Sequence, residues 1–321
     1  MIQNYPWHKQ IWQQLTAGFH ENRMPHALLF TGAAGLGKNE LAVRLAHFLL
    51  CNNPADDACG ACVSCKLLAH HSHPDLYILG TEEGMIKIDQ IRELIHELTQ
   101  TAHQGKWRAV IINNAHAMNL AAANALLKTL EEPQAQVVII LLSDHASFLP
   151  ATIHSRCQNV EFLPPSLTEA KSWLSENIKE SANIDLLLRL TENAPLRALA
   201  LARQMPEREK LLQDIVAFSS GKIALNQIVA NSMNYSWEFI FYHLLSLVLD
   251  GIKIRQGATQ ITNQDKPEIL SSFKANTEQL FKYCDRLLEL NKFIQEKINL
   301  NQQLLMENIW LEWLSLTPVN Y

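Results

Sequence analysis

The chain has 321 residues, of which 48% are hydrophobic, and its formal net charge at pH 7 is −5. This length suffices for two or three domains with buried cores, and the negative charge argues against a general nucleic-acid coat, because phosphate binding needs clustered cations. No apolar run is long enough for a membrane span, and the first residues lack the basic and apolar regions of a signal peptide. We therefore expect a cytoplasmic protein with no membrane segment.

A glycine-rich loop is the most informative motif near the N-terminus. It lies between an apolar run at 27–30, which is typical of a strand, and a segment at 39–50 with helical apolar spacing. Strand, loop and helix in this order are the context of a G-x-x-x-x-G-K phosphate-binding loop, whose backbone N–H groups surround phosphate oxygens. Lys38 would reach the β- and γ-phosphates. The candidate nucleotide-binding residues in this loop are Gly32, Gly35, Gly37, Lys38 and Asn39.

Two features depart from an ATP-hydrolysing site. Asn39 stands where the motif has Ser or Thr, whose hydroxyl binds Mg²⁺. The β-branched run at 109–112 is typical of a buried parallel strand, and in a working P-loop ATPase its tip carries a metal-binding Asp and, in many families, a Glu that prepares water. Here Asn113 and Asn114 follow the run, and neither can bear negative charge. The sequence therefore predicts negligible intrinsic ATP hydrolysis.

Four of the six cysteines fall between residues 51 and 65, with two overlapping C-x-x-C steps. Four thiolates at such spacing favour tetrahedral Zn²⁺ in a closed, structural site. A redox dithiol or disulfides are the alternatives, although nothing else indicates an oxidising compartment. His70, His71 or His73 could replace one thiolate, whereas Cys157 and Cys284 stand alone and are expected to stay reduced. The predicted zinc ligands are Cys51, Cys59, Cys62 and Cys65.

Further elements follow in chain order up to a double proline. Residues 119–133 predict a helix, opened by a capping Asn and stopped by Pro. The run at 137–142, followed by Ser143 and Asp144, predicts another buried strand, and residues 149–157 predict a short helix with Arg156 near its end. A last strand at 159–162 precedes the prolines, which mark a domain boundary.

Every periodic segment beyond this boundary has helical spacing. Residues 167–206 predict a small bundle that ends at Met205-Pro206, and long amphipathic helices follow from about 207. Residues 257–267 are polar and predict a loop. The aromatic residues of this part lie among Leu and Ile rather than Lys and Arg, which favours core or subunit packing over stacking on bases. They are Trp237, Phe239, Phe241, Tyr242, Trp310 and Trp313.

Together these features resemble the bacterial DNA polymerase III clamp loader, within the AAA+ superfamily, and in particular its delta-prime group. The resemblance spans essentially the whole chain and is strongest over the first 165 residues. The segments that carry it are the glycine loop at 32–39, the cysteine cluster, the Ala-Ala-Asn-Ala-Leu-Leu-Lys-Thr-Leu-Glu-Glu-Pro run at 122–133, Ser155-Arg156-Cys157 and, more weakly, residues 301–307.

The resemblance implies an α/β AAA+ P-loop domain, a parallel sheet flanked by helices, at residues 1–165, with a zinc module at 51–65. It also implies a small helical lid domain at 166–206 and an all-α collar domain for oligomerisation at 207–321. Arg197 resembles the phosphate-sensing arginine of the second AAA+ domain. Static binding of ATP or ADP stays open, because the alternative is that Lys38 and Arg197 make structural contacts around an empty pocket.

By the same resemblance, Arg156 would be an arginine finger that acts in trans on the ATP site of a neighbouring subunit. The expected partners are ATPase subunits and a clamp-opening subunit in a hetero-pentameric ring, with the sliding clamp and primed DNA reached through the complex. The chain would not be an enzyme in isolation but a subunit of the DNA polymerase III holoenzyme. Two other readings are an autonomous AAA+ ATPase, which Asn113 and Asn114 oppose, and a stand-alone zinc nucleic-acid-binding module, which the absence of Lys and Arg from residues 51–65 opposes.

Overall fold

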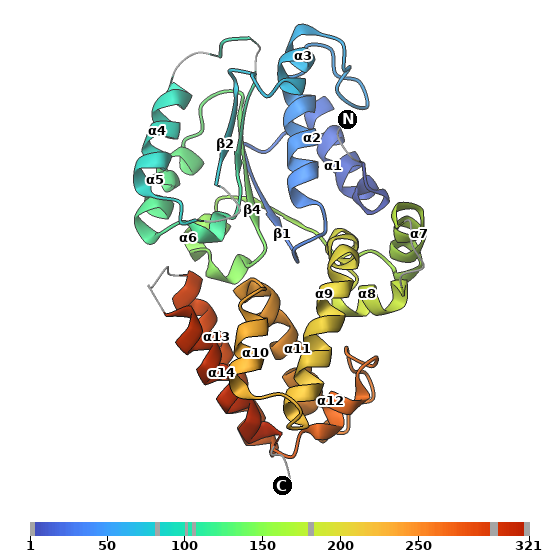
Figure 1. Ribbon diagram of the computed structural model, residues 1–321. Coiled ribbons are helices and arrows are strands. Elements are labelled where there is room, and N and C mark those ends of the chain that lie inside the picture. Colours follow the sequence, from blue (N-terminus) through green and yellow to red (C-terminus); the bar gives the residue numbers. More distant parts are fainter. Residues whose placement is uncertain are drawn as a thin grey trace. The chain divides into compact units, whose positions relative to one another are not determined.

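The computed structural model describes residues 4–80, 84–99, 102–104, 107–178, 183–295 and 301–317. The chain forms two compact units, Met1–Trp173 with Asn193–Arg197, and Leu174–Glu192 with Ala198–Tyr321 (Figure 1). Among the described helices, none combines the length and the apolar character that a membrane crossing requires.

A five-stranded parallel sheet forms the centre of the first unit, with the strand order β2-β3-β4-β1-β5. The parallel sheet confirms the predicted fold class, and the predicted strands at 27–30, 109–112, 137–142 and 159–162 are all present. Because parallel strands end at one edge of a sheet, the segments that follow β1, β3 and β4 lie together. The strands are β1 (Ala27–Thr31), β2 (Leu76–Leu79), β3 (Arg108–Ile112), β4 (Val137–Ser143) and β5 (Gln158–Glu161).

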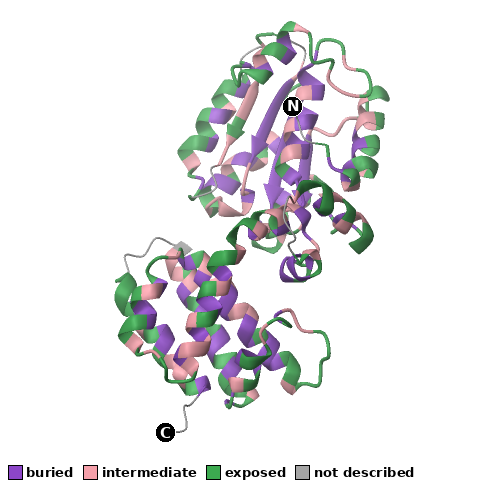
Figure 2. Cartoon of the chain, turned by 45° about the vertical axis from the view of Figure 1, so that its right-hand side comes forward, coloured by how far each residue is buried: buried purple, intermediate pink, exposed green. Residues whose placement is uncertain are grey.

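Successive residues of a strand point to opposite sides of the sheet. Both faces of this sheet therefore carry apolar side chains, and helices cover both faces. Leu28 and Phe30 pack in a core with residues of α1 and α2, whereas Ala27 and Leu29 pack in a second core with residues of α4 and α5. The middle strands are accordingly buried along their length (Figure 2). The helical segments are η1 (Pro6–His8), α1 (Lys9–His20), α2 (Lys38–Leu50), α3 (Val63–Ala69), α4 (Ile88–Thr99), η2 (Ala115–Ala117), α5 (Leu120–Glu131), η3 (Ala146–Phe148) and α6 (Ala151–His154).

The described part of the second unit is helical, and α7 and α9 each begin in the first unit and continue into it. Trp310 and Trp313 are fully buried in its core, and their indole N–H groups donate to Ser232 Oγ at 3.0 Å and Ser219 Oγ at 2.9 Å. This packing confirms the prediction that these aromatic residues belong to a core. The helices are α7 (Leu167–Asn177), α8 (Ile184–Leu190), α9 (Pro195–Ser219), α10 (Leu225–Ser232), α11 (Trp237–Arg255), α12 (Pro267–Ser272), α13 (Thr277–Gln295) and α14 (Gln302–Leu316).

The helix break predicted at Met205-Pro206 is wrong, because α9 continues through Pro206. Proline cannot donate to the carbonyl four residues earlier, which costs a helix interior about 3 kcal/mol. Leu211 and Leu212, in the part of α9 that follows Pro206, are buried in the core of the second unit, and their burial offsets this cost. The predicted division into three domains at residues 165 and 206 stays a prediction.

Candidate functional site

The glycine loop joins β1 to α2, as the motif predicts. Gly35 has φ +82°, and a Cβ atom at this position would lie 2.6 Å from Cβ of Arg197. A Cβ atom at Gly32 would lie 2.3 Å from the carbonyl oxygen of Phe162, so neither position accepts a side chain. The N–H of Leu196 donates to the carbonyl of Gly35 at 3.1 Å, which joins the loop to the beginning of α9.

Aromatic residues near the N-terminus form hydrogen bonds with the backbone of the glycine loop. Trp7 Nε1 donates to the carbonyl of Leu36 at 2.9 Å, and His8 Nε2 lies 2.7 Å from the same oxygen. Burial lowers the pKa of His8 to about 4, so the ring is neutral at pH 7 and donates through Nε2–H. Sequence reasoning missed these residues, and the run Tyr5-Pro6-Trp7-His8 was the available signal.

Lys38 is turned onto its own loop. Its side chain is 7% exposed, and Nζ donates to the carbonyl oxygens of Gly32 and Ala33, each at 2.7 Å. Nζ also lies 2.5 Å from Oδ1 of Asp144, which follows β4 and was not among the predicted site residues. The sequence did place Asp144 directly after a predicted strand. Because that strand, β4, lies next to β1 in the sheet, the position of Asp144 was a signal that it could reach the glycine loop.

A cavity of about 740 Å³ opens beside the loop at the carboxyl edge of the sheet. Asn113 and Asn114, at the end of β3, line it where an ATPase carries its acids. Oδ1 of Asn113 is buried without a hydrogen-bond partner, and its Nδ2 donates to the carbonyl of Gly80 at 3.5 Å. The predicted nucleotide-binding residues that line this cavity are Gly35, Gly37, Lys38, Asn39 and Arg197, while Gly32 lies in the loop itself.

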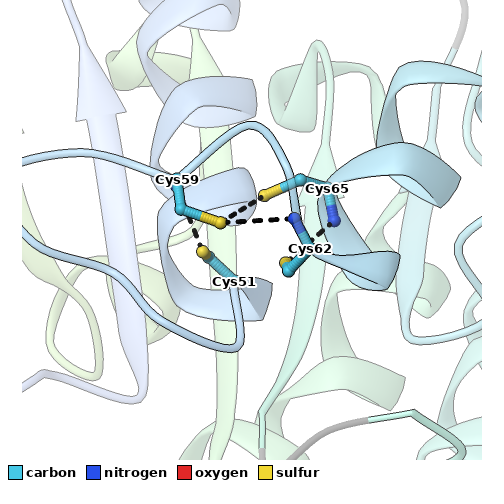
Figure 3. A group of neighbouring side chains, drawn as sticks. All are labelled: Cys51, Cys59, Cys62 and Cys65. Carbon is cyan, nitrogen blue, oxygen red and sulfur yellow. Dashed lines mark hydrogen bonds between the residues drawn. The ribbon is translucent and has the colours of Figure 1, made fainter.

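The four predicted zinc ligands converge after α2 (Figure 3). Their sulfur atoms all lie within 4.8 Å of one another. The N–H of Cys59 donates to Cys51 Sγ at 3.2 Å, and the N–H of Cys65 donates to Cys62 Sγ at 3.4 Å as Cys62 caps α3. Hydrogen bonds from the backbone N–H groups of Ala61 and Cys62 lower the pKa of Cys59 to about 6, which favours the thiolate. The cluster can hold a metal ion, and four thiolates fit tetrahedral Zn²⁺.

A buried polar chain fixes the two ends of the cysteine loop. Ser64 Oγ donates to the carbonyl of Leu50 at 2.5 Å and lies 2.7 Å from Nε2 of His73. Nδ1 of His73 accepts the N–H of Asp75 at 3.1 Å. His73 is therefore occupied by Ser64 and the backbone, and the group that could hold a metal ion consists of the four cysteines.

Arg156 lies just after α6, and its side chain is bound by residues of the same chain. Its Nε and Nη2 both donate to Oε1 of Glu131, with Nε at 2.7 Å, and Nη1 donates to the carbonyl of Thr152 at 3.0 Å and to Ser155 Oγ at 3.1 Å. The side chain keeps 30% exposure. The guanidinium at the ends of α5 and α6 is therefore partly exposed and bound within the chain.

The fold and this site define a P-loop domain, with a parallel sheet flanked by helices, followed by a helical region. A DNA polymerase III gamma subunit-related protein from Thermotoga maritima shares the fold, with a TM-score of 0.51 and 20% identity over 95% of this chain and 99% of that one. Residues 7–166 match the family described as DNA polymerase III, delta subunit, and residues 202–315 match the family described as DNA polymerase III, delta subunit, C terminal.

Relatives along the whole length identify the family more narrowly. The chain is 33% identical to DNA polymerase III subunit delta' of Pseudomonas aeruginosa, over 98% of this chain and 99% of that protein. It is 31% identical to DNA polymerase III subunit delta' of Escherichia coli, over 96% of this chain and 94% of that protein. The chain belongs to the family of DNA polymerase III delta' subunits.

Proposed function

We propose that this chain is a non-hydrolysing subunit of the DNA polymerase III clamp loader in the cytoplasm and supports ATP-dependent loading of the sliding clamp onto primed DNA. The end of β3 carries this proposal, because Asn113 and Asn114 line the cavity where an ATPase needs acids to hold Mg²⁺ and activate water. Asp144 does not stand at the position of those acids, because it follows β4 rather than β3, and its carboxylate is paired with Lys38.

The proposed role of Arg156 is that of an arginine finger for the ATP site of a neighbouring ATPase subunit. It would stabilise the charge that develops on the transferred phosphoryl group. Its exposure and its position at the end of a helix support the proposal, although Glu131 must release the guanidinium before it can contact a phosphate.

In this proposal the second unit contributes to a ring of five subunits that includes ATPase subunits and a clamp-opening subunit. Its helices would form the collar. The lid segment at 166–206 would include Arg197, which belongs to the first unit and lines the cavity there. Bound Zn²⁺ would hold Cys51, Cys59, Cys62 and Cys65 together and thereby fold residues 51–65. Since four thiolates leave no open coordination position, the metal would be structural.

The test is ATP turnover, stimulated by clamp and primed DNA, in a loader reconstituted with wild-type chain or with Arg156→Ala. A finger contributes about 10³–10⁵ to the rate at its site, so the variant should remove turnover at one site and lower the total by at least the share of that site. Arg92→Ala is the matched control, because Arg92 is exposed on α4 of the same unit.

Gel filtration must show that both variants assemble as wild type does. Unchanged turnover in an intact Arg156→Ala loader would reject the finger, and ATP hydrolysis by the isolated chain would reject the non-hydrolysing assignment in favour of an autonomous ATPase.

A further inference from the structure

The pocket beside the glycine loop contains an anion from the chain itself. Asp144 follows β4, and β4 lies between β1 and β3 in the sheet, so this carboxylate is delivered to the same edge as the loop. Oδ1 of Asp144 lies 2.5 Å from Nζ of Lys38, the group expected to bind the β- and γ-phosphates. A carboxylate oxygen therefore lies where a phosphate oxygen would bind.

The ammonium group of Lys38 has no remaining capacity in this arrangement. A lysine has three N–H donors, and Nζ contacts three acceptors, which are the carbonyls of Gly32 and Ala33 and the carboxylate of Asp144. Lys38 is 7% exposed, whereas Asp144 keeps 31% exposure. The pair is therefore partly desolvated, and charge-assisted contacts of this kind are stronger than those between exposed side chains.

We propose that Asp144 is the residue that sets the affinity of this pocket for nucleotide phosphates, because it occupies Lys38 as a built-in anion. An incoming ATP or ADP must displace the carboxylate from Lys38 and then lies beside it. Asn113 and Asn114 offer no carboxylate for a metal ion that could relieve the resulting repulsion. The pocket keeps a phosphate-binding loop and a cavity of about 740 Å³, but its cation is already satisfied. This inference does not depend on ring assembly or on the finger.

The substitution Asp144→Asn tests it in the isolated full-length chain. Asparagine keeps an oxygen that can accept from Lys38 but removes the charge that competes with phosphate. We expect ATP to bind at least about tenfold more tightly than to wild type, because like-charge juxtaposition costs several kcal/mol and each tenfold is about 1.4 kcal/mol. Isothermal titration calorimetry with ATP in Mg²⁺, ADP and inorganic pyrophosphate measures the affinities.

Two variants make the result specific. Glu93→Gln removes a charge from an exposed position on α4, outside the cavity lining, and should bind ATP as weakly as wild type. The double variant Asp144→Asn with Lys38→Ala should lose the gained affinity, which places the new binding at this loop. Circular dichroism confirms that all variants are folded.

The inference is overturned if wild type and Asp144→Asn bind ATP equally, whether tightly or not at all. It is also overturned if Glu93→Gln gains as much as Asp144→Asn, since the net charge of the chain would then matter and contact with Lys38 would not. Gain of pyrophosphate affinity together with ATP affinity supports competition for Lys38, whereas gain for ATP without pyrophosphate contradicts it.

Discussion

The cysteine loop and the glycine loop lie at the two ends of α2, but they have opposite charge balances. In the cysteine loop the N–H groups of Cys59 and Cys65 donate to sulfur. The pKa is lowered for Cys59 and Cys62, whereas burial raises it for Cys51 and Cys65, so the buried thiols favour a metal ion that can balance their thiolates. In the glycine loop the positive charge of Lys38 is balanced by Asp144. The first loop brings together four thiols that could hold a metal ion, whereas the positive charge in the second is balanced by a side chain of the same chain.

The largest effect is expected for a substitution in the cysteine loop. Cys59→Ser should lower zinc affinity by at least about 100-fold and destabilise residues 51–65, because zinc binding supplies about 10–16 kcal/mol in zinc-finger peptides. Competition with a chromogenic chelator measures the affinity, and thermal unfolding with and without chelator measures the stability. Cys157→Ser is the control, since Cys157 lies outside the cluster. Equal zinc content in the two variants would contradict the prediction.

The next effect concerns the support of the glycine loop. The pKa of His8 is about 4 in the folded chain, below the ordinary 6.5, so the unfolded chain binds more protons between these values. The contribution of His8 is therefore fully present above pH 6.5 and is lost as pH falls toward 4, by about 3 kcal/mol.

His8→Gln removes this titration and keeps an N–H donor for the carbonyl of Leu36. Its free energy of unfolding should depend less on pH than that of wild type, by about 3 kcal/mol between pH 7 and pH 4. Urea denaturation across this range measures the difference. His96→Gln, which changes an exposed histidine on α4, should retain the wild-type slope, and a wild-type slope in His8→Gln would refute the prediction.

The smallest effect compares the enclosed Lys38 pair with an exposed one. Arg156 and Glu131 keep 30% and 49% exposure, so Glu131→Gln should lower the free energy of unfolding by less than about 1 kcal/mol. Glu132→Gln is the control at the neighbouring exposed position, and urea denaturation in low and high salt measures both. A loss well above 1 kcal/mol would mean that the Arg156 pair is structural rather than a reversible contact.

Local patterns predicted the elements whose pattern is complete within a few residues. The strand, loop and helix around Lys38 are present, and Asn119 caps α5 by accepting the N–H of Ala122, as its position before the helix indicated. The four-residue strand β2 and the helices α1, α3 and α4 were not assigned. β2 is an edge strand with a half-exposed Ile78, and its pairing with β3 rather than its own pattern defines it. Pro206 led to the opposite error, the prediction of a helix break where α9 continues. Burial of residues further along α9 outweighs the free-energy cost of proline inside the helix.

The sequence by itself determined the phosphate-binding loop, the four clustered thiols and the missing acids at Asn113 and Asn114, because each depends on residue types and spacing within one segment. Only the tertiary structure decided that Lys38 is paired with Asp144 and that Arg156 is held by Glu131. In both ion pairs the two residues come from separate elements of the chain. Strand order brings the ends of β1 and β4 together, and packing brings α5 beside α6. Residue spacing within a single segment therefore could not predict either ion pair.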